Sequence, residues 1–320
     1  MKNNNEKYNA QNNYSSLDEF IFEYKRDVPN FYDENESMIY DIPVDGGTIR
    51  VYHHKPQNIT AKRPIVFLPG FATTPEIWSI FHKTHHGNTE YYHIETREKN
   101  SAHIERKRKT DLSINRFALD VAKVINFFGL DNNDYVLFGT CLCGGVVLHG
   151  LINKILNPPT TIVFDPFVKW TQSRFLIKFI MPILPPFMLG LIKYLLAKIL
   201  ISKMKNEVQK ERDMAVVDSA IPWVWRKFSI QNLKHDLTND LNKITNEVYV
   251  FHGPKDKYHP DEVFQNIAKE IPKGHYFQMI TSDDLRELLA GVIATEYSKI
   301  TKNNDIPKTL EPYEVVLKRG

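Results

Sequence analysis

The chain has 320 residues, of which 42% are hydrophobic and 12% aromatic, and its 41 Lys and Arg against 38 Asp and Glu give a formal net charge of +3. This composition supplies a large apolar core and excludes a disordered protein. A charge so close to zero argues against a nucleic-acid partner, and we expect none. Only two cysteines occur, Cys141 and Cys143, one residue apart, which excludes a disulfide-stapled secreted domain.

The amino-terminal segment 1–36 is predicted to be a tail that is partly disordered. Its first 16 residues are dominated by Asn, Lys, Ser and Tyr and show no hydrophobic periodicity, as is typical of a solvated segment. They contain neither the apolar stretch of a secretory signal nor an arginine-rich transit sequence. We therefore expect a cytoplasmic protein.

A hairpin and then a series of buried strands are predicted after the tail. Polar and apolar residues alternate on both sides of the turn sequence Asp45-Gly46-Gly47, which indicates two antiparallel strands joined by this turn. Short apolar runs typical of parallel strands buried on both faces follow at intervals. These runs are 65–68, 91–94, 135–138, 161–164, 248–251 and 275–280.

A helix is predicted between the second and third of these runs. Apolar residues recur at helical spacing from Ile114 to Phe128, with Ser113 before them as an N-cap and Gly129 after them as a stop. Strands that alternate with helices in this way predict an α/β fold, in which a mostly parallel central sheet carries helices on both faces.

A long insertion interrupts the alternation. About 80 residues separate the run 161–164 from the run 248–251, far more than a crossover helix needs, so 167–246 is interpreted as an inserted helical cap. Its most apolar part, 175–201, contains three lysines and three prolines, whereas a membrane span needs about 20 uninterrupted apolar residues. Two short helices joined by a proline turn are predicted. They either pack over the body and line an acyl pocket or lie in a membrane interface with their lysines reaching outward.

The strongest candidate for a catalytic motif is the segment Gly139-Thr140-Cys141-Leu142-Cys143-Gly144-Gly145, which joins a predicted strand to a predicted helix. It resembles the nucleophile elbow of the α/β-hydrolase fold, with cysteine in place of serine, and the elbow alone is similar to that of polyhydroxyalkanoate synthase-like proteins. Cys141 is favoured as the nucleophile over Cys143, because only Cys141 follows a glycine by two residues. Cys143 then stands where the family has its second glycine, and Gly144 comes one residue later.

The two cysteines admit two interpretations. A thiol at a helix N-terminus faces the positive end of the helix dipole, which lowers its pKa and favours a nucleophile. Alternatively, Cys141 and Cys143 are small buried residues of a tight turn, since free cysteine is often a core residue.

The resemblance implies further site residues. The segment Pro69-Gly70-Phe71-Ala72 matches the loop that lends an oxyanion amide, with Pro69 in place of the usual histidine, and the donors would be the backbone amides of Phe71 and Leu142. Asp256, after the strand 248–251, matches the acid that orients a histidine. A plain turn aspartate is the alternative interpretation.

The histidine of the family's pattern is missing. It follows the last strand in the family, yet residues 281–286 contain none. His275 begins that strand, about 16 Å from the edge where the site is expected, at about 3.3 Å per residue. His259, three residues after Asp256, is the candidate base. The other histidines considered are His252 at a strand end, His149 on the elbow helix, and His82, His85, His86 and His103.

These features predict an α/β-hydrolase core in two parts, 37–166 and 247–302, with a cap at 167–246 and a carboxyl-terminal extension at 303–320. The predicted function is an ester or thioester hydrolase or acyltransferase that uses Cys141 on an apolar acyl group, a small molecule or an acyl lipid. The alternative is a catalytically impaired protein that binds an acyl lipid or a partner. We expect no cofactor and no metal, and peripheral membrane contact through the cap is the second interpretation of its location. The sequence assigns no oligomeric state.

Overall fold

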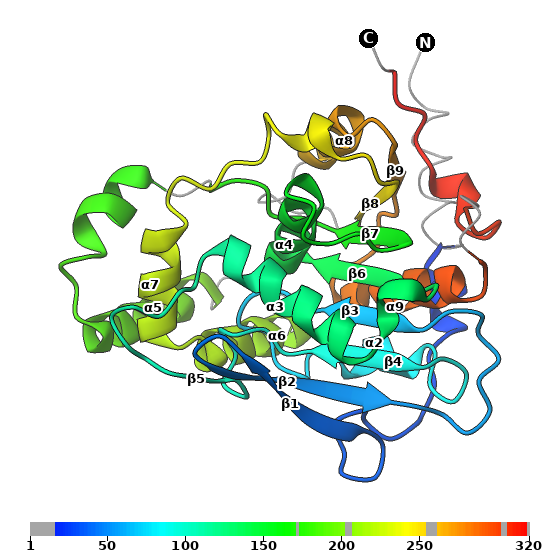
Figure 1. Cartoon of the computed structure of the whole chain (residues 1–320), viewed down its shortest axis with the longest axis horizontal. Coiled ribbons are helices and arrows are strands. Elements are labelled where there is room, and N and C mark those ends of the chain that lie inside the picture. The colour runs from blue at the N-terminus through cyan, green and yellow to red at the C-terminus, as the bar shows by residue number, and fades with distance from the viewer. Residues whose placement is uncertain (1–16, 171–172, 202–206, 254–260, 302–305, 319–320) are drawn as a thin grey trace.

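The computed structural model describes residues 17–170, 173–201, 207–253, 261–301 and 306–318, and a single twisted sheet crosses it (Figure 1). The strand order is β1-β2-β4-β3-β6-β7-β8-β9, with β5 beside β2. The strands are β1 (Met38–Val44), β2 (Gly47–His54), β3 (Ile65–Leu68), β4 (Tyr91–Ile94), β5 (His103–Ile104), β6 (Val136–Thr140), β7 (Thr160–Phe164), β8 (Val248–His252) and β9 (Gly274–Gln278).

The apolar runs predicted as parallel strands are confirmed. Every neighbouring pair from β4 through β3, β6, β7 and β8 to β9 is parallel. The hairpin of β1 and β2 is antiparallel, and its turn contains Gly46 with φ of +80°. Gly47 has a second reason to be glycine, because a Cβ there would lie 2.0 Å from the carbonyl oxygen of His103.

Helices cover both faces of the sheet, as predicted. Successive side chains of β3 point to opposite faces, so Val66 and Leu68 join one core and Ile65 and Phe67 the other. Helices α3, α4 and α8 pack on the first core, and α2 and α9 pack on the second. Their bounds are α2 (Ser79–Lys83), α3 (Ile114–Phe127), α4 (Cys141–Ile152), α8 (Asp261–Glu270) and α9 (Arg286–Ser298).

The predicted ends of α3 are confirmed by its capping geometry. The side chain of Ser113 accepts a hydrogen bond from the backbone N–H of Arg116 at 3.2 Å, which satisfies one of the free donors of the first turn. The chain leaves the helix at Gly129, whose φ is +64°. The short helical turn η1 (Leu130–Asn132) follows and leads into β6.

The segment between β7 and β8 is helical and projects to the left of the view in Figure 1. The expected pair of short helices is a π-helical turn followed by a longer helix that starts at Pro186, where the missing proline N–H costs no hydrogen bond. Across the described residues, no helix has the length and apolarity to span a membrane. The elements between β7 and β8 are η2 (Leu176–Ile180), α5 (Pro186–Ile201), α6 (Glu207–Ser219), α7 (Pro222–Gln231) and η3 (Leu241–Lys243).

Both terminal segments contribute to the packed body where they are described. Leu17, Ile21 and Phe31, within the segment assigned to the tail, are buried in the same core as α9. In the carboxyl-terminal extension, the N–H of Val315 donates to the carbonyl oxygen of Tyr276 at 2.8 Å, so the chain runs along β9. The described helical elements also include residues 17–22 and the short turns η4 (Asp283–Leu285) and η5 (Glu311–Tyr313).

Candidate active site

The strand β6 turns into helix α4 at Cys141. Cys141 has φ of +47°, a left-handed conformation that residues other than glycine seldom adopt. Cys143 lies within the helix and is fully buried, with its Sγ 3.9 Å from the hydroxyl of Thr96. The strained position at the strand–helix junction is therefore that of Cys141, and this strained turn presents the residue at the sheet edge.

Glycines around the turn permit close approach of strand, helix and inserted segment. A Cβ at Gly139 would lie 2.8 Å from the carbonyl oxygen of Cys143, and one at Gly144 would lie 2.9 Å from Cβ of Pro166. The tightest position is Gly145, where a Cβ would lie 1.9 Å from the carbonyl oxygen of Phe167. Side chains at these three positions would force the elbow apart. A cysteine is accommodated at 143 because its side chain points into the core.

The pKa of the Cys141 thiol is raised, although the residue has an exposed face. Burial by the surrounding chain is the largest cause, and the negative charge of Asp165 adds to it. A hydrogen bond from the N–H of Leu142 and the cations Arg286 and Lys99 act in the opposite direction. The expectation of a lowered pKa from the helix dipole is thus wrong in its net direction, because desolvation outweighs the helix terminus.

The loop after β3 lies directly against Cys141 and is held in place by a buried lysine. A Cβ at Gly70 would lie 3.3 Å from Cβ of Cys141. Lys99 Nζ donates to the carbonyl oxygens of Gly70 and Thr73, at 2.9 Å for Thr73, and the Thr73 hydroxyl donates to the Gly70 carbonyl at 2.8 Å. Ala72 adopts φ of +55° within this loop. The two segments that carry the amides of Phe71 and Leu142 therefore meet at Cys141.

A charged network that the sequence did not predict lies at the same edge. Asp165 follows β7 with φ of +46°, and its carboxylate accepts a hydrogen bond from His252 Nδ1 at 2.6 Å. The other oxygen of Asp165 is 3.5 Å from Arg286, and His252 Nε2 is 2.9 Å from a carboxylate oxygen of Asp261. Asp165 could have been identified from the sequence as a candidate site residue, because it directly follows a predicted parallel strand. Arg286 could not, because only the packing of α9 brings it there.

The two residues predicted to complete the catalytic set, Asp256 and His259, lie outside the described residues. The segment 279–301 after β9 has no histidine in its sequence. His275 is paired with Glu247 at 3.0 Å and with Glu314 at 2.7 Å at the start of β9, in accord with its rejection as a base. His149, on α4, is near Asn115 at 3.3 Å, and His103 lies on β5.

Helices of the inserted segment cover the loop and the elbow helix. The rings of Phe71 and Phe228 lie 5.2 Å apart between centroids, and Leu142 joins a buried cluster with Val224 of α7. The hydroxyl of Ser219, at the end of α6, donates to the carbonyl oxygen of Ala72. The insertion therefore contacts both segments that carry the expected oxyanion donors.

A cavity of about 220 Å³ lies beside the same loop. It is lined by polar groups of Thr73, Glu95, Lys99 and Ser219, together with Tyr52, Ala72, Thr74, Pro75, Glu76, Asn100 and Ser101. Ligand pockets usually measure about 300–1,000 Å³ and are mostly apolar. This cavity is therefore smaller than a usual ligand pocket.

Comparisons with known proteins establish the fold. No family model and no curated protein match the chain in sequence. An esterase from Exiguobacterium antarcticum superposes with a TM-score of 0.60 at 18% identity, covering 82% of this chain and 100% of its own. A thermophilic esterase from Thermogutta terrifontis gives 0.58 at 16%, with 81% and 95% covered. An α/β hydrolase from Sphaerobacter thermophilus gives 0.59 at 12%, with 80% and 98% covered. The chain has the α/β-hydrolase fold.

Proposed function

We propose that the protein is an enzyme that hydrolyses or transfers the acyl group of an ester or thioester, with Cys141 as its nucleophile. The observation that carries this proposal is the left-handed backbone of Cys141 at the strand–helix junction, directly against the loop of Gly70. Strain of this kind persists where the surrounding structure enforces it, and it concentrates at functional sites. A merely structural cysteine in a tight turn has no need for an adjacent loop fixed by a buried lysine.

The proposed reaction has two steps. The base takes the proton of the Cys141 thiol, the thiolate sulfur forms a C–S bond to the carbonyl carbon, and the amides of Phe71 and Leu142 stabilise the resulting oxyanion. The bond from this carbon to the leaving oxygen or sulfur of the substrate then breaks, and the alcohol or thiol leaves with the proton that the base returns. Water or an acceptor alcohol then attacks the acyl-enzyme and restores the thiol. Because the thiol pKa is raised, both steps need a base, and His259 oriented by Asp256 is proposed for that role.

Intact-mass spectrometry tests the nucleophile. The protein is exposed to activated acyl esters and to acyl-CoA of several chain lengths, beside Cys141→Ala and the matched control Cys143→Ala. We expect one acyl adduct in the wild type and in Cys143→Ala and none in Cys141→Ala. An adduct that persists in Cys141→Ala would exclude Cys141. Accumulation of the adduct, rather than turnover, would show that no base completes the second step.

The raised pKa of the Cys141 thiol and the lack of histidine in 279–301 favour a second candidate, a catalytically impaired protein that binds an acyl lipid. The same experiment distinguishes the two. Binding of a fatty acyl ligand without any covalent adduct, in a folded wild-type protein, would support the binding function and contradict the enzymatic one.

We further propose that α5 and η2 contact an anionic membrane surface. Residues 166–206 contain seven Lys or Arg and no Asp or Glu. Large apolar side chains on α5 and on the turn that precedes it are exposed, among them Ile183 at 78%, Phe187 at 77% and Leu191 at 63%. An apolar face flanked by cations matches anionic lipid better than a protein partner or bare solvent.

Liposome flotation tests this contact. The double variant Phe187→Asp/Leu191→Asp should bind vesicles of anionic phospholipid at least tenfold more weakly than the wild type, and Phe127→Asp, at an exposed apolar position on α3, is the matched control. Equal flotation of the double variant and the wild type would refute the proposed membrane contact. Lys193 is not one of the outward lysines, because its Nζ donates to the carbonyl oxygens of Val217 at 2.6 Å and Ala220 at 2.7 Å.

A further inference from the structure

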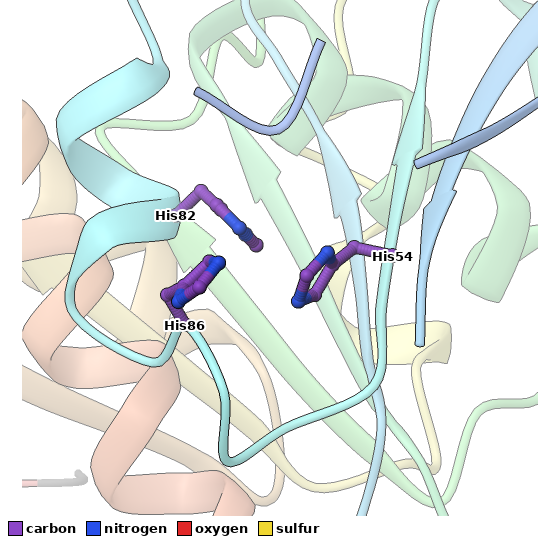
Figure 2. Close-up of side chains that lie close together, drawn as sticks. All are labelled: His54, His82 and His86. Atoms are coloured by element: carbon purple, nitrogen blue, oxygen red, sulfur yellow. The ribbon is translucent and has the colours of Figure 1, made fainter. Parts of the chain in front are cut away.

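Three histidine rings converge between β2 and the segment around α2. Figure 2 shows the rings of His54, His82 and His86 pointing toward one another, and a ring nitrogen from each lies within 4.8 Å of the others. His54 ends β2, His82 is in α2, and His86 follows that helix. His86 is four positions after His82, and the centroids of their rings lie 5.3 Å apart.

Three buried ring nitrogens of this cluster have no hydrogen-bond partner among the described residues. His82 is completely buried, and neither of its ring nitrogens is hydrogen-bonded. Nε2 of His54 is buried and unpaired as well. A neutral imidazole carries one donor and one acceptor, and burying both without partners is unfavourable. A metal ion would satisfy the acceptor nitrogen of such a ring, and an imidazole lone pair is a common metal ligand.

Glu36 orients the other two rings. Its carbonyl oxygen accepts a hydrogen bond from His54 Nδ1 at 2.6 Å, so Nε2 of His54 carries the lone pair. Its carboxylate accepts one from His86 Nε2 at 3.0 Å, which leaves the lone pair of His86 on Nδ1. Metal-binding histidines usually donate their second N–H to a carbonyl or carboxylate in this way, which fixes the tautomer and the direction of the ring. One residue thus prepares two ligands.

A cluster held by ring packing alone is the competing explanation. The rings do contact one another, at 4.6 Å between His54 and His82 and 5.3 Å between His82 and His86. Packing accounts for the proximity, but it does not account for a fully buried ring with both nitrogens unpaired. His85, the neighbouring buried histidine, differs in this respect, because its Nδ1 is 3.2 Å from the hydroxyl of Thr84.

We propose that His54, His82 and His86 bind one divalent transition-metal ion, with Zn²⁺ as the best match to three imidazole ligands, and that Glu36 is the positioning residue of the site. Zn–N bonds measure about 2.0–2.1 Å, so bound nitrogens would lie about 3.4 Å apart, and a modest rotation of the rings closes the site. The fourth position is open to water.

The site lies at the sheet edge opposite Cys141. His54 pairs with Tyr91 at the start of β4, Tyr91 with Ile65 at the start of β3, and Ile65 with Val136 at the start of β6. Cys141 follows the other end of β6. The ion would therefore join β2, α2 and the segment before β1 without touching the acyl chemistry, and its proposed role is structural.

Metal analysis tests the proposal. The full chain is purified without a polyhistidine tag and dialysed against Zn²⁺, and we expect one ion per chain. His82→Gln and His86→Gln should weaken binding at least tenfold, and Glu36→Ala by roughly 10–100-fold. His149→Gln is the histidine control, and Cys141→Ser/Cys143→Ser is the thiol control. The thermal midpoint of the wild type should rise with Zn²⁺ and not with Mg²⁺.

Three outcomes would overturn the site. A folded wild type that binds no stoichiometric Zn²⁺ removes the ligand altogether. Unchanged affinity in both His82→Gln and His86→Gln places the ion elsewhere, and loss of the ion in the Cys141→Ser/Cys143→Ser variant assigns it to the thiols. Because the wild-type measurement needs no substitution, a variant that fails to fold leaves the proposal testable. Since the two sites lie at opposite sheet edges, acylation of Cys141 is measured separately.

Discussion

Replacing Lys99 by methionine is expected to disrupt the loop that faces Cys141. Lys99 is buried and donates to two carbonyl oxygens of the loop, and its Nζ is 3.6 Å from a carboxylate oxygen of buried Glu98. Lys99→Met removes these hydrogen bonds and leaves Glu98 without its cation. Breaking a buried pair in this way costs about 3–5 kcal/mol of unfolding free energy. If the amide of Phe71 is an oxyanion donor as proposed, its displacement should lower the acylation rate by about 10²–10³-fold.

The pH dependence of the variant separates the charge effect from lost packing. Burial raises the pKa of Glu98 in the folded protein, whereas Lys99 lowers it. A carboxyl group whose folded pKa is raised contributes stability that is present below its unfolded pKa and is lost as the pH rises through the folded pKa. Because Lys99→Met raises this folded pKa further, the variant should be closest to the wild type in acid and fall away toward neutral pH.

Urea unfolding at pH 5 and pH 8, for Lys99→Met, Glu98→Gln and the double variant, measures both effects. The double variant should recover at least half of the loss at pH 8, since no unpaired carboxylate is left buried. A loss in Lys99→Met below about 1 kcal/mol, the scale of an ordinary neutral hydrogen bond, would refute the reasoning. So would a loss that is equal at both pH values and undiminished in the double variant.

Two further predictions concern the elbow and its charged network. Gly145→Ala should lower the free energy of unfolding by about 1–3 kcal/mol, because its Cβ would overpack against the carbonyl oxygen of Phe167. Gly190→Ala in α5 should raise it by about 0.5–1 kcal/mol, because its Cβ would meet only Pro222 at 3.5 Å. Urea unfolding of both variants measures this difference, and equal effects would contradict it. Asp165→Asn should destabilise by about 3–5 kcal/mol because it removes the buried negative charge that faces His252 and Arg286. An unchanged thermal midpoint would show that this charge contributes little.

The fold was largely predictable from the sequence because the sheet is buried on both faces. Each parallel strand is then a short apolar run, and the runs at 65–68 and 91–94 match β3 and β4 residue for residue. The helix from Ile114 was equally readable, because its apolar face and the cap at Ser113 are local signals. Local signals of this kind need no knowledge of distant contacts.

The site was predictable only where the chemistry lies on one continuous segment. The elbow is local, so the strained position of Cys141 followed from the glycines around it. The network of Asp165, His252 and Arg286 joins the ends of two strands with the start of α9, and side chains so far apart in sequence meet only through tertiary packing. The prediction of a lowered pKa for the Cys141 thiol was wrong for the same reason. Burial of this thiol raises its pKa, and burial by segments distant in sequence cannot be recognised from the sequence.

The loop facing Cys141 has two independent supports, one from the core and one from the insertion. Lys99 holds Gly70 and Thr73 from within, and Ser219 holds Ala72 from the end of α6. That end of α6 is in turn held by Lys193 of α5, through the carbonyl oxygens of Val217 and Ala220. If α5 lies on a membrane as proposed, one short chain of hydrogen bonds connects this helix to the loop that faces Cys141. A membrane-bound acyl lipid would then meet the site where the insertion already fixes its geometry.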